Sequence, residues 1–202
     1  MKILIKWTAF FALALVLCQG IGLLRDRQTL DRGLVRLHVV GASNSDEDQG
    51  IKLRVRDAVL AQVSRLGTPE NAQEALALLK ANLSSLEQAA NETLNALGSS
   101  DTASVTLCRE VFPVREYDSF TLPSGVYESL RVRIGEAAGR NWWCVVFPTL
   151  CFRATAEELD AVAAGAGFSQ SLTGAITGQE EYEIRFFLLD ALGQLENILH
   201  KE

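Results

Sequence analysis

The side chains with reactive chemistry in this 202-residue chain are four cysteines and two histidines. A Cys–His nucleophile pair would need Cys144 or Cys108 beside His38, and the spacing of these residues does not bring them together. Cys144 stands between Trp143 and Val145, where a buried thiol is inert as a nucleophile. The two histidines are far apart, and the cysteine separations do not match those of zinc ligands. We therefore expect no catalytic site, no metal ion and no cofactor.

Segment 1–24 has the pattern of an export signal. Lys2 and Lys6 precede the apolar run 7–18, as the positive and apolar regions of a signal peptide do. Weak apolar character continues to the end of the segment, so an uncleaved membrane anchor is the alternative. We expect the export machinery to move the chain across the cytoplasmic membrane, with 30–202 as one domain.

Export makes a disulfide possible, because bridges persist in oxidising compartments. Cys144 and Cys151 flank the turn-forming pair Pro148 and Thr149, so we predict that these two cysteines are bridged and that Cys108 stays free. Three small buried thiols are the alternative structural interpretation. The competing function is a thiol-dependent enzyme of the cell envelope that uses Cys144 or Cys151.

The charge balance is acidic, with 19 basic against 25 acidic residues. A nucleic-acid partner is not expected, because phosphate binding draws on clustered Lys and Arg. The chain is 48% hydrophobic and 22% charged, which is typical of a globular protein. Its length is sufficient for one domain with a substantial core.

Four stretches have the apolar or alternating pattern of strands: 34–40, 103–111, 124–134 and 142–147. A turn with Gly135 and Gly139 separates the last two stretches, which indicates a hairpin. The final stretch is apolar throughout, so we expect its strand to be central and covered on both faces.

Helical spacing of apolar residues predicts a helix over 46–66, with Ser45 or Asp46 as its N-cap. A second helix opens at Pro69 and continues to Gly98. The capping box 155–158 opens a short third helix.

The glycine- and serine-rich stretch 165–178 is interpreted as a mobile loop. The last helix begins near Glu180, and its apolar residues are expected to face the core: Ile184, Phe187, Leu188, Ala191, Leu192, Leu195 and Ile198. The element order predicts an α+β single domain, with a mostly antiparallel sheet and helices packed on one face.

Three separated blocks of the chain resemble the stage II sporulation protein R family. They are 36–49 with Lys52 and 55–57, then 122–127 with 130–132, and finally 135–151, which contains Asn-Trp-Trp-Cys-Val-Val-Phe-Pro-Thr-Leu-Cys. The chain departs from the usual family residues at Ala42, Asn44, Ala137 and Thr149.

The resemblance implies a signalling protein that is made in the forespore and exported into the space between forespore and mother cell. There it would activate a membrane-embedded aspartic protease that processes an inactive sigma factor of the sigma E type. The chain would then be an activating ligand and not an enzyme.

Polar residues of these blocks that packing does not explain are expected to form the partner-binding surface, with a tryptophan as its anchor. The candidates are Arg36, His38, Asn44, Asp46, Asp48, Gln49, Lys52, Arg56, Asp57, Asn141, Trp142 and Trp143. The alternative is that Asp46 and Asp48 only cap a helix while Lys52 and Arg56 are solvated. Trp142 and Trp143 point to opposite faces of a strand, so either one is exposed or both are buried.

Overall fold

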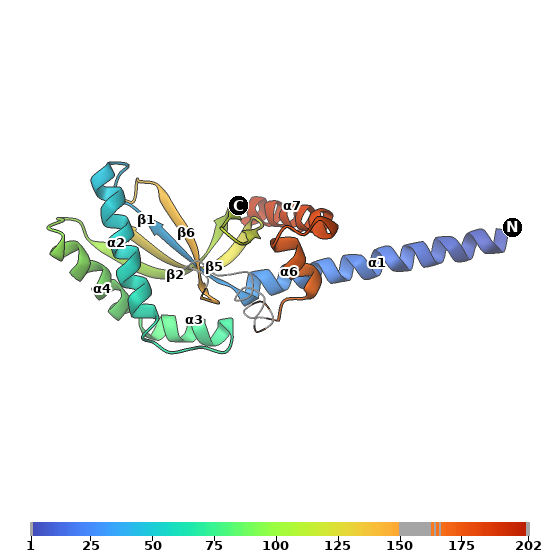
Figure 1. The fold of residues 1–202 in the computed structure, drawn as a ribbon, viewed down its shortest axis with the longest axis horizontal. Helices are drawn as coiled ribbons and strands as arrows, with labels where there is room; N and C mark the ends of the chain where they lie inside the picture. The colour runs from blue at the N-terminus through green and yellow to red at the C-terminus, as the bar shows by residue number, and fades with distance from the viewer. Residues whose placement is uncertain (1, 150–162, 164, 166, 201–202) are drawn as a thin grey trace.

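The computed structural model describes residues 2–149, 163, 165 and 167–200. Its centre is a four-stranded sheet with the order β2-β5-β1-β6 (Figure 1). The strands are β1 Val35–Val40, β2 Ala103–Phe112, β5 Gly125–Ile134 and β6 Asn141–Phe147. β5 pairs antiparallel with β2, and β6 pairs antiparallel with β1, whereas β1 and β5 are parallel. The predicted α+β class with a mostly antiparallel sheet is confirmed.

The predicted hairpin between β5 and β6 is wrong, because β1 lies between these two strands. The connection passes over the end of β1, where the amide of Ala138 donates to the Ala42 carbonyl and that of Gly139 donates to the Gly41 carbonyl. A Cβ on Gly139 would overlap the Ser43 carbonyl oxygen, so only glycine fits this crossing. β6 is therefore an edge strand and not a central one.

Both faces of β6 are nevertheless covered, as its apolar sequence predicts. Cys144 and Val146 belong to the first core cluster, together with Val35, whereas Val145 belongs to the second, together with Leu34. The two clusters lie on opposite faces of the sheet, because alternate residues of a strand point to opposite sides.

Three helices cover the face of the sheet that bears the first core cluster: α2 Asp46–Val63, α3 Ala72–Ala81 and α4 Leu83–Ala96. The prediction of one helix from Pro69 to Gly98 is wrong, because the chain breaks at Asn82 (φ −118°, ψ 13°). The side-chain amide of Asn82 donates to the Leu78 carbonyl at the end of α3. That bond satisfies a carbonyl that would otherwise lack a partner at a helix end.

The prediction that helices pack on one face is wrong, because a second group of elements packs on the other face: the end of α1 Lys2–Gly33, α6 Gln170–Ile176, η1 Glu180–Tyr182 and α7 Glu183–His200. α6 corrects the prediction of a mobile loop over 165–178. The hydroxyl of Ser169 accepts from the Leu172 amide and caps α6, and Leu172 and Ile176 are fully buried. The predicted helix at 155–158 lies outside the described residues.

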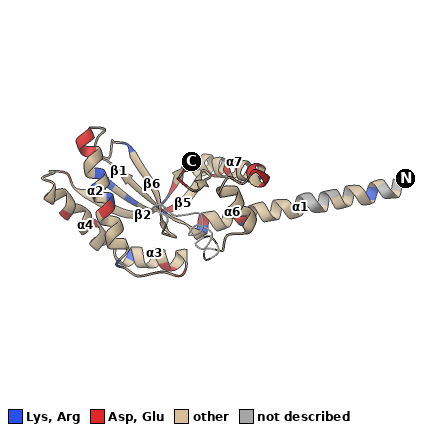
Figure 2. Cartoon of the chain, in the orientation of Figure 1, with Lys and Arg blue, Asp and Glu red and all other residues tan. Residues whose placement is uncertain are grey.

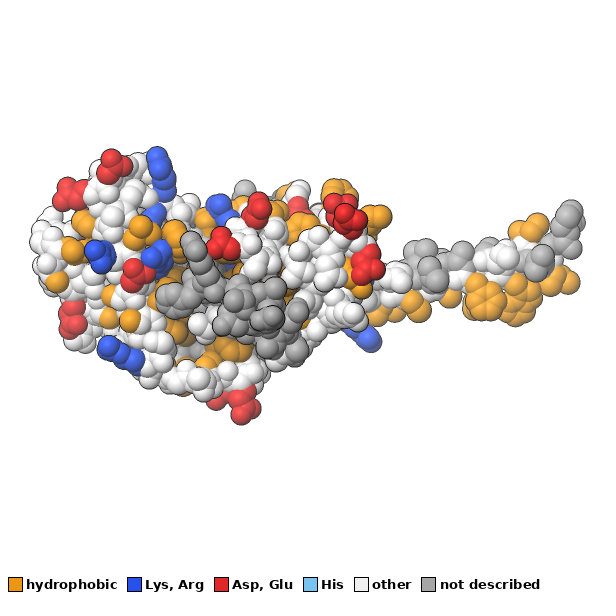
Figure 3. Space-filling view, in the orientation of Figure 1, with side chains coloured by type: hydrophobic (Ala, Val, Ile, Leu, Met, Phe, Trp, Pro, Cys, Tyr) orange, Lys and Arg blue, Asp and Glu red, His pale blue; other side chains and the backbone are white. Residues whose placement is uncertain are grey.

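The end of α1 is part of the domain. Asp26, Arg27 and Leu30 are buried, and Arg27 Nη1 donates to the Ser124 carbonyl at 2.8 Å. The beginning of α1 extends away from the rest of the chain and carries exposed apolar side chains (Figure 3). Phe11 is one of them. Within the described ranges, no helix combines the length and the apolarity of a membrane span. The assignment of 1–24 as a signal or anchor stays a prediction.

The prediction that the apolar face of α7 packs on the core is wrong, because this face points to solvent. Ile184, Phe187 and Ile198 are exposed, whereas the buried side of the helix is formed by Leu189 and Gly193. The reversal follows from the close approach of α7 to the start of β5. A Cβ on Gly193 would overlap the Ser124 carbonyl oxygen, so the glycine side of the helix must face the sheet.

Candidate partner-binding surface

The turn between β1 and α2 is fixed by side-chain hydrogen bonds. Ser45 is the N-cap of α2 and accepts from the Asp48 amide at 3.1 Å, as predicted. The Ser43 hydroxyl donates to the Asp48 carboxylate, and Gln49 Nε2 donates to the Ser43 carbonyl at 2.7 Å. Asp48 and Gln49 thus hold the turn, while Asn44 beside them is exposed. The acidic start of α2 also complements the helix dipole (Figure 2).

Lys52 joins this turn to the segment before β6. Its Nζ donates to Gln49 Oε1 at 2.5 Å and to the Arg140 carbonyl at 3.0 Å. The residue is buried, and this burial lowers the pKa of its ammonium group, with Arg140 and Arg56 adding to the effect. The candidate Lys52 is therefore a buried residue that connects the start of α2 to the segment before β6, and it is not part of an exposed surface.

Arg56 lies over the ring of Trp142, with Cζ 4.3 Å from the ring centroid. Its Nη2 is 2.6 Å from Asp57 Oδ1, and Asp57 is exposed. A cation over a tryptophan face contributes roughly 0.5–1 kcal/mol at an exposed site. The contact holds the Arg56 side chain of α2 against the edge strand β6. We call the accessible part of this region the α2–β6 corner, formed by Asn44, Asp46, Arg56, Asp57, Asn141 and Trp142.

A buried polar cluster lies on the opposite face of the sheet. His38 Nδ1 donates to Glu110 Oε2 at 3.0 Å, and His38 Nε2 is 2.9 Å from Asn141 Oδ1. Arg131 donates to the same Glu110 oxygen, with its Nε at 2.8 Å. Burial by itself would raise the pKa of Glu110, but the hydrogen bonds from His38 and Arg131 outweigh it and lower this pKa to about 2.

Arg36 lies deeper in the same cluster and is fully buried. Its guanidinium is 4.2 Å from the ring centroid of Phe112 and 5.0 Å from that of Tyr127. Nη2 donates to the Tyr117 hydroxyl at 2.6 Å. Arg36 and His38 are thus interior residues, and the structure separates them from the candidates on the corner. Asn141 belongs to both regions, because its side chain is exposed yet bonds to His38.

The two tryptophans match neither predicted alternative completely, because both are half-buried. Trp142 packs against the first core cluster and Trp143 against the second. Trp143 stacks on His38 with ring centroids 3.8 Å apart and meets Phe112 edge-on at 4.6 Å. Trp143 is therefore mainly a packing residue, and Trp142 is the better anchor for a partner.

The cysteines bear on the thiol-dependent alternative. Cys144 is buried and disulfide-bonded, so it has no thiolate available for nucleophilic attack. Cys18 and Cys108 are free, and burial raises the pKa of the Cys108 thiol. Cys151 lies outside the described residues, so its pairing with Cys144 stays a prediction.

Sequence reasoning missed three residues of the buried polar cluster: Glu110, Arg131 and Tyr117. Two of them could have been found from the sequence. A charged side chain on the core-facing side of an alternating strand is buried and therefore needs a partner of opposite charge. Glu110 and Arg131 stand in two such strands. Tyr117 follows strand β3 Arg115–Glu116, which pairs with β4 Thr121–Leu122. The sequence around Tyr117 has no alternating pattern that would predict its partial burial.

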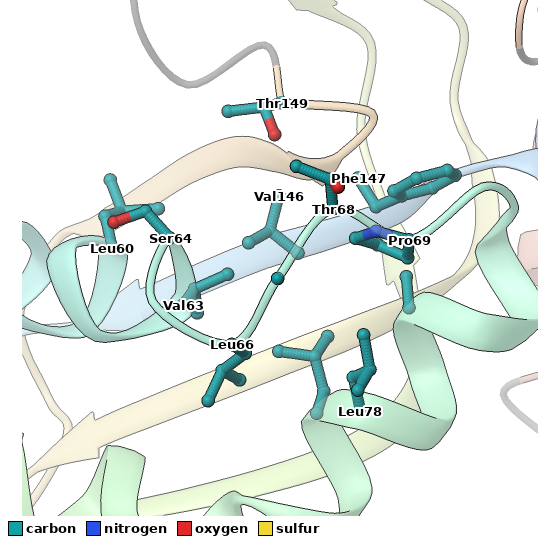
Figure 4. Close-up of a pocket in the computed structure, with 13 residues that line it drawn as sticks. Leu60, Val63, Ser64, Leu66, Thr68, Pro69, Leu78, Val146, Phe147 and Thr149 are labelled. Carbon is teal, nitrogen blue, oxygen red and sulfur yellow. The ribbon is translucent and has the colours of Figure 1, made fainter.

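An apolar cavity of about 170 Å³ lies at the other end of β6 (Figure 4). Val63 lines it from the end of α2, Leu66 from the turn after that helix, Leu78 from α3, and Val146 and Phe147 from the last residues of β6. Pockets that enclose a small-molecule ligand measure roughly 300–1,000 Å³. The cavity is smaller than that and shares no residue with the α2–β6 corner.

The fold and the site define a class: an α+β domain that presents a charged and aromatic surface at the edge of its sheet. The family model described as "Stage II sporulation protein R" matches residues 31–157, which include the corner and most of the sheet. The chain belongs to the stage II sporulation protein R family.

A relative of that name from Bacillus subtilis (strain 168) is 34% identical over 119 residues, which are 58% of this chain and 53% of the relative. The chain thus matches about half the length of this curated relative. No solved structure matches this chain significantly.

Proposed function

We propose that this chain is an exported signalling protein of sporulation. In the space between forespore and mother cell, it activates a membrane-embedded aspartic protease that processes a pro-sigma factor of the sigma E type. Family membership supports the role in sporulation. The signalling role, the protease partner and the location are the parts that need an experiment.

The observation that carries the proposal is the construction of the α2–β6 corner. Lys52 ties the start of α2 to the Arg140 carbonyl, and Arg56 covers the Trp142 ring, so charged and aromatic groups are held in one arrangement. A rigid aromatic anchor beside oriented charges is the composition of a protein-binding site. The charges would orient the encounter and Trp142 would supply the buried contact.

The chemistry of the described residues favours a ligand over an enzyme. Both ring nitrogens of His38 are hydrogen-bonded, one to Glu110 and one to Asn141, so this histidine belongs to a buried network of side chains. Cys144 is in a disulfide. We therefore assign the polar cluster to the support of the sheet beneath the corner.

Two features support an exported location. The apolar beginning of α1 extends away from the domain, as a signal or anchor handled by the export machinery would. The disulfide at Cys144 is a bond that persists in oxidising compartments outside the cytoplasm.

The test is reconstitution in a host that does not sporulate. The full chain, the candidate protease and its pro-sigma substrate are expressed together, and the size of the substrate is followed on an immunoblot. We expect processing only when all three are present, and none when a catalytic aspartate of the protease is replaced by asparagine. Processing that is equally efficient without this chain would refute its role as the activator.

A further inference from the structure

The outer face of α7 is an apolar surface that the fold leaves uncovered. The exposed fractions are 77% for Ile184, 70% for Phe187, 54% for Leu195 and 63% for Ile198. These side chains lie along one side of a single helix, so they form a continuous stripe and not scattered positions. Large contiguous apolar patches on a folded surface mark interaction sites.

The spacing of the stripe identifies a helix as the element that fits it. Ile184, Leu188, Ala191, Leu195 and Ile198 are separated by alternating steps of four and three residues. That is the heptad repeat with which two helices pack side chains between one another. A flat or irregular partner does not require such a repeat.

The stripe is also symmetric about its centre. Ile184 and Ile198 lie equally far from Ala191 along the helix, and so do Phe187 and Leu195. When a second α7 is laid antiparallel with the two Ala191 residues at the crossing point, isoleucine meets isoleucine and phenylalanine meets leucine. The small side chain of Ala191 lets the two backbones approach. Such self-complementarity is the requirement of a two-fold interface between identical chains.

The charges at the two ends of α7 select the antiparallel arrangement. Glu180, Glu181 and Glu183 are exposed at its start, whereas the exposed His200 at its end is followed in the sequence by Lys201 and Glu202, whose charges cancel. A parallel pair would bring the two acidic starts together, and an antiparallel pair keeps them apart by placing each beside an end without excess negative charge. The same acidic residues disfavour an anionic membrane surface, which attracts helices with a basic polar face.

We propose that the α7 stripe is the docking site for a second copy of this chain, which packs antiparallel through Ile184, Phe187, Leu188, Ala191, Leu195 and Ile198 to give a two-fold dimer. The α2–β6 corner shares no residue with this stripe. The dimer therefore presents two copies of the corner, and the inference goes beyond the proposed function.

The test introduces a pair of opposite charges across the two-fold axis. The oligomeric state of the full chain in a non-ionic detergent is measured by sedimentation. The wild type is expected to be a dimer at about 100 μM, a concentration that populates complexes of micromolar affinity. Phe187→Glu and Leu195→Lys each place a charge in the apolar contact and should each weaken the dimer at least about tenfold. The double variant sets the introduced carboxylate of one chain beside the introduced ammonium group of the other, and should recover the dimer.

Two controls separate the surface from the fold. Leu97 is exposed at the end of α4, far from α7 in the sequence, and Leu97→Lys makes the same chemical change as Leu195→Lys without altering the stripe. This variant should remain dimeric. All four variants should keep the thermal midpoint of the wild type within a few degrees, because the substituted side chains are exposed.

The outcomes that overturn the proposal are distinct. A monomeric wild type at this concentration rules out the second copy as the occupant. A dimer that the single variants leave intact shows that another surface carries it. A double variant that stays monomeric contradicts the antiparallel register. Binding of the wild type to phosphatidylglycerol vesicles that is lost in both single variants, without any dimer, would assign the stripe to lipid instead.

Discussion

Glu110 and His38 are hydrogen-bonded at 3.0 Å although their strands are not neighbours. Glu110 stands on β2 and His38 on β1, and β5 runs between them. The carboxylate reaches across β5 and also accepts from Arg131 of that strand. One acidic side chain therefore links three of the four strands beneath the α2–β6 corner.

This link predicts an acid-dependent loss of stability. The folded pKa of Glu110, about 2, lies below its ordinary value of 4.5, so the unfolded chain binds more protons between these two values. The stabilisation is complete above pH 4.5 and is lost as the pH falls through 2. At neutral pH it is at most about 3 kcal/mol. We expect Glu110→Gln to lower the free energy of unfolding at pH 7 and to flatten its fall between pH 4.5 and 2. Urea titrations of the full chain measure this, with Glu136→Gln at an exposed loop position as the control.

Asp31 predicts the opposite pH dependence. Its burial raises the pKa to about 7 from an ordinary 3.8, against the opposing effect of Arg27, whose Nη2 is 3.0 Å away. The folded chain thus binds more protons than the unfolded one between these values, and stability falls as the pH rises through this window. Asp31→Asn should therefore stabilise the protein at pH 8 by about 1–4 kcal/mol, with the gain disappearing near pH 4.

Glu70→Gln, at an exposed position outside the α2–β6 corner, is the control for Asp31→Asn. A destabilised Asp31→Asn protein at pH 8 would mean that the ion pair with Arg27 outweighs the cost of burying the carboxylate.

Two helical glycines should respond in opposite directions to alanine. Gly50 in α2 has open space around its Cβ position, so Gly50→Ala should stabilise by about 0.5–1 kcal/mol through helix propensity. A Cβ on Gly193 in α7 would overlap the Ser124 carbonyl oxygen, so Gly193→Ala must push α7 away from β5 and lower the melting temperature. Equal melting temperatures for the two variants would contradict the observed packing of α7 against the start of β5.

Local pattern in the sequence is sufficient for the strands and for the start of α2, because alternation and capping act within a few residues. Ser45 and the strand 125–134 illustrate this. The order of the strands is a different matter. β1 enters between β5 and β6, and the choice of that neighbour depends on contacts that no local pattern contains.

α7 shows a second limit of the sequence. Its apolar stripe gives a correct helix but the wrong orientation, because Gly193 and the Ser124 carbonyl decide which side approaches the sheet. The candidate site is divided for a similar reason. Spacing could group Arg36 and His38 with Lys52 and Arg56, but only the register of the sheet places the first pair inside and Arg56 at the edge.

The most direct measurement of the central claim is sigma-factor processing by the Arg56→Ala protein in the reconstituted host. Arg54→Ala is the matched control, because Arg54 is an exposed residue of the same type on the same helix. Loss of the contact with Trp142 should cost only about 1 kcal/mol, so both variants should fold and be exported at the level of the wild type. We expect Arg54→Ala to support full processing and Arg56→Ala to support none. A folded and exported Arg56→Ala protein that processes the sigma factor fully would contradict the assignment of the α2–β6 corner as the protease-activating surface.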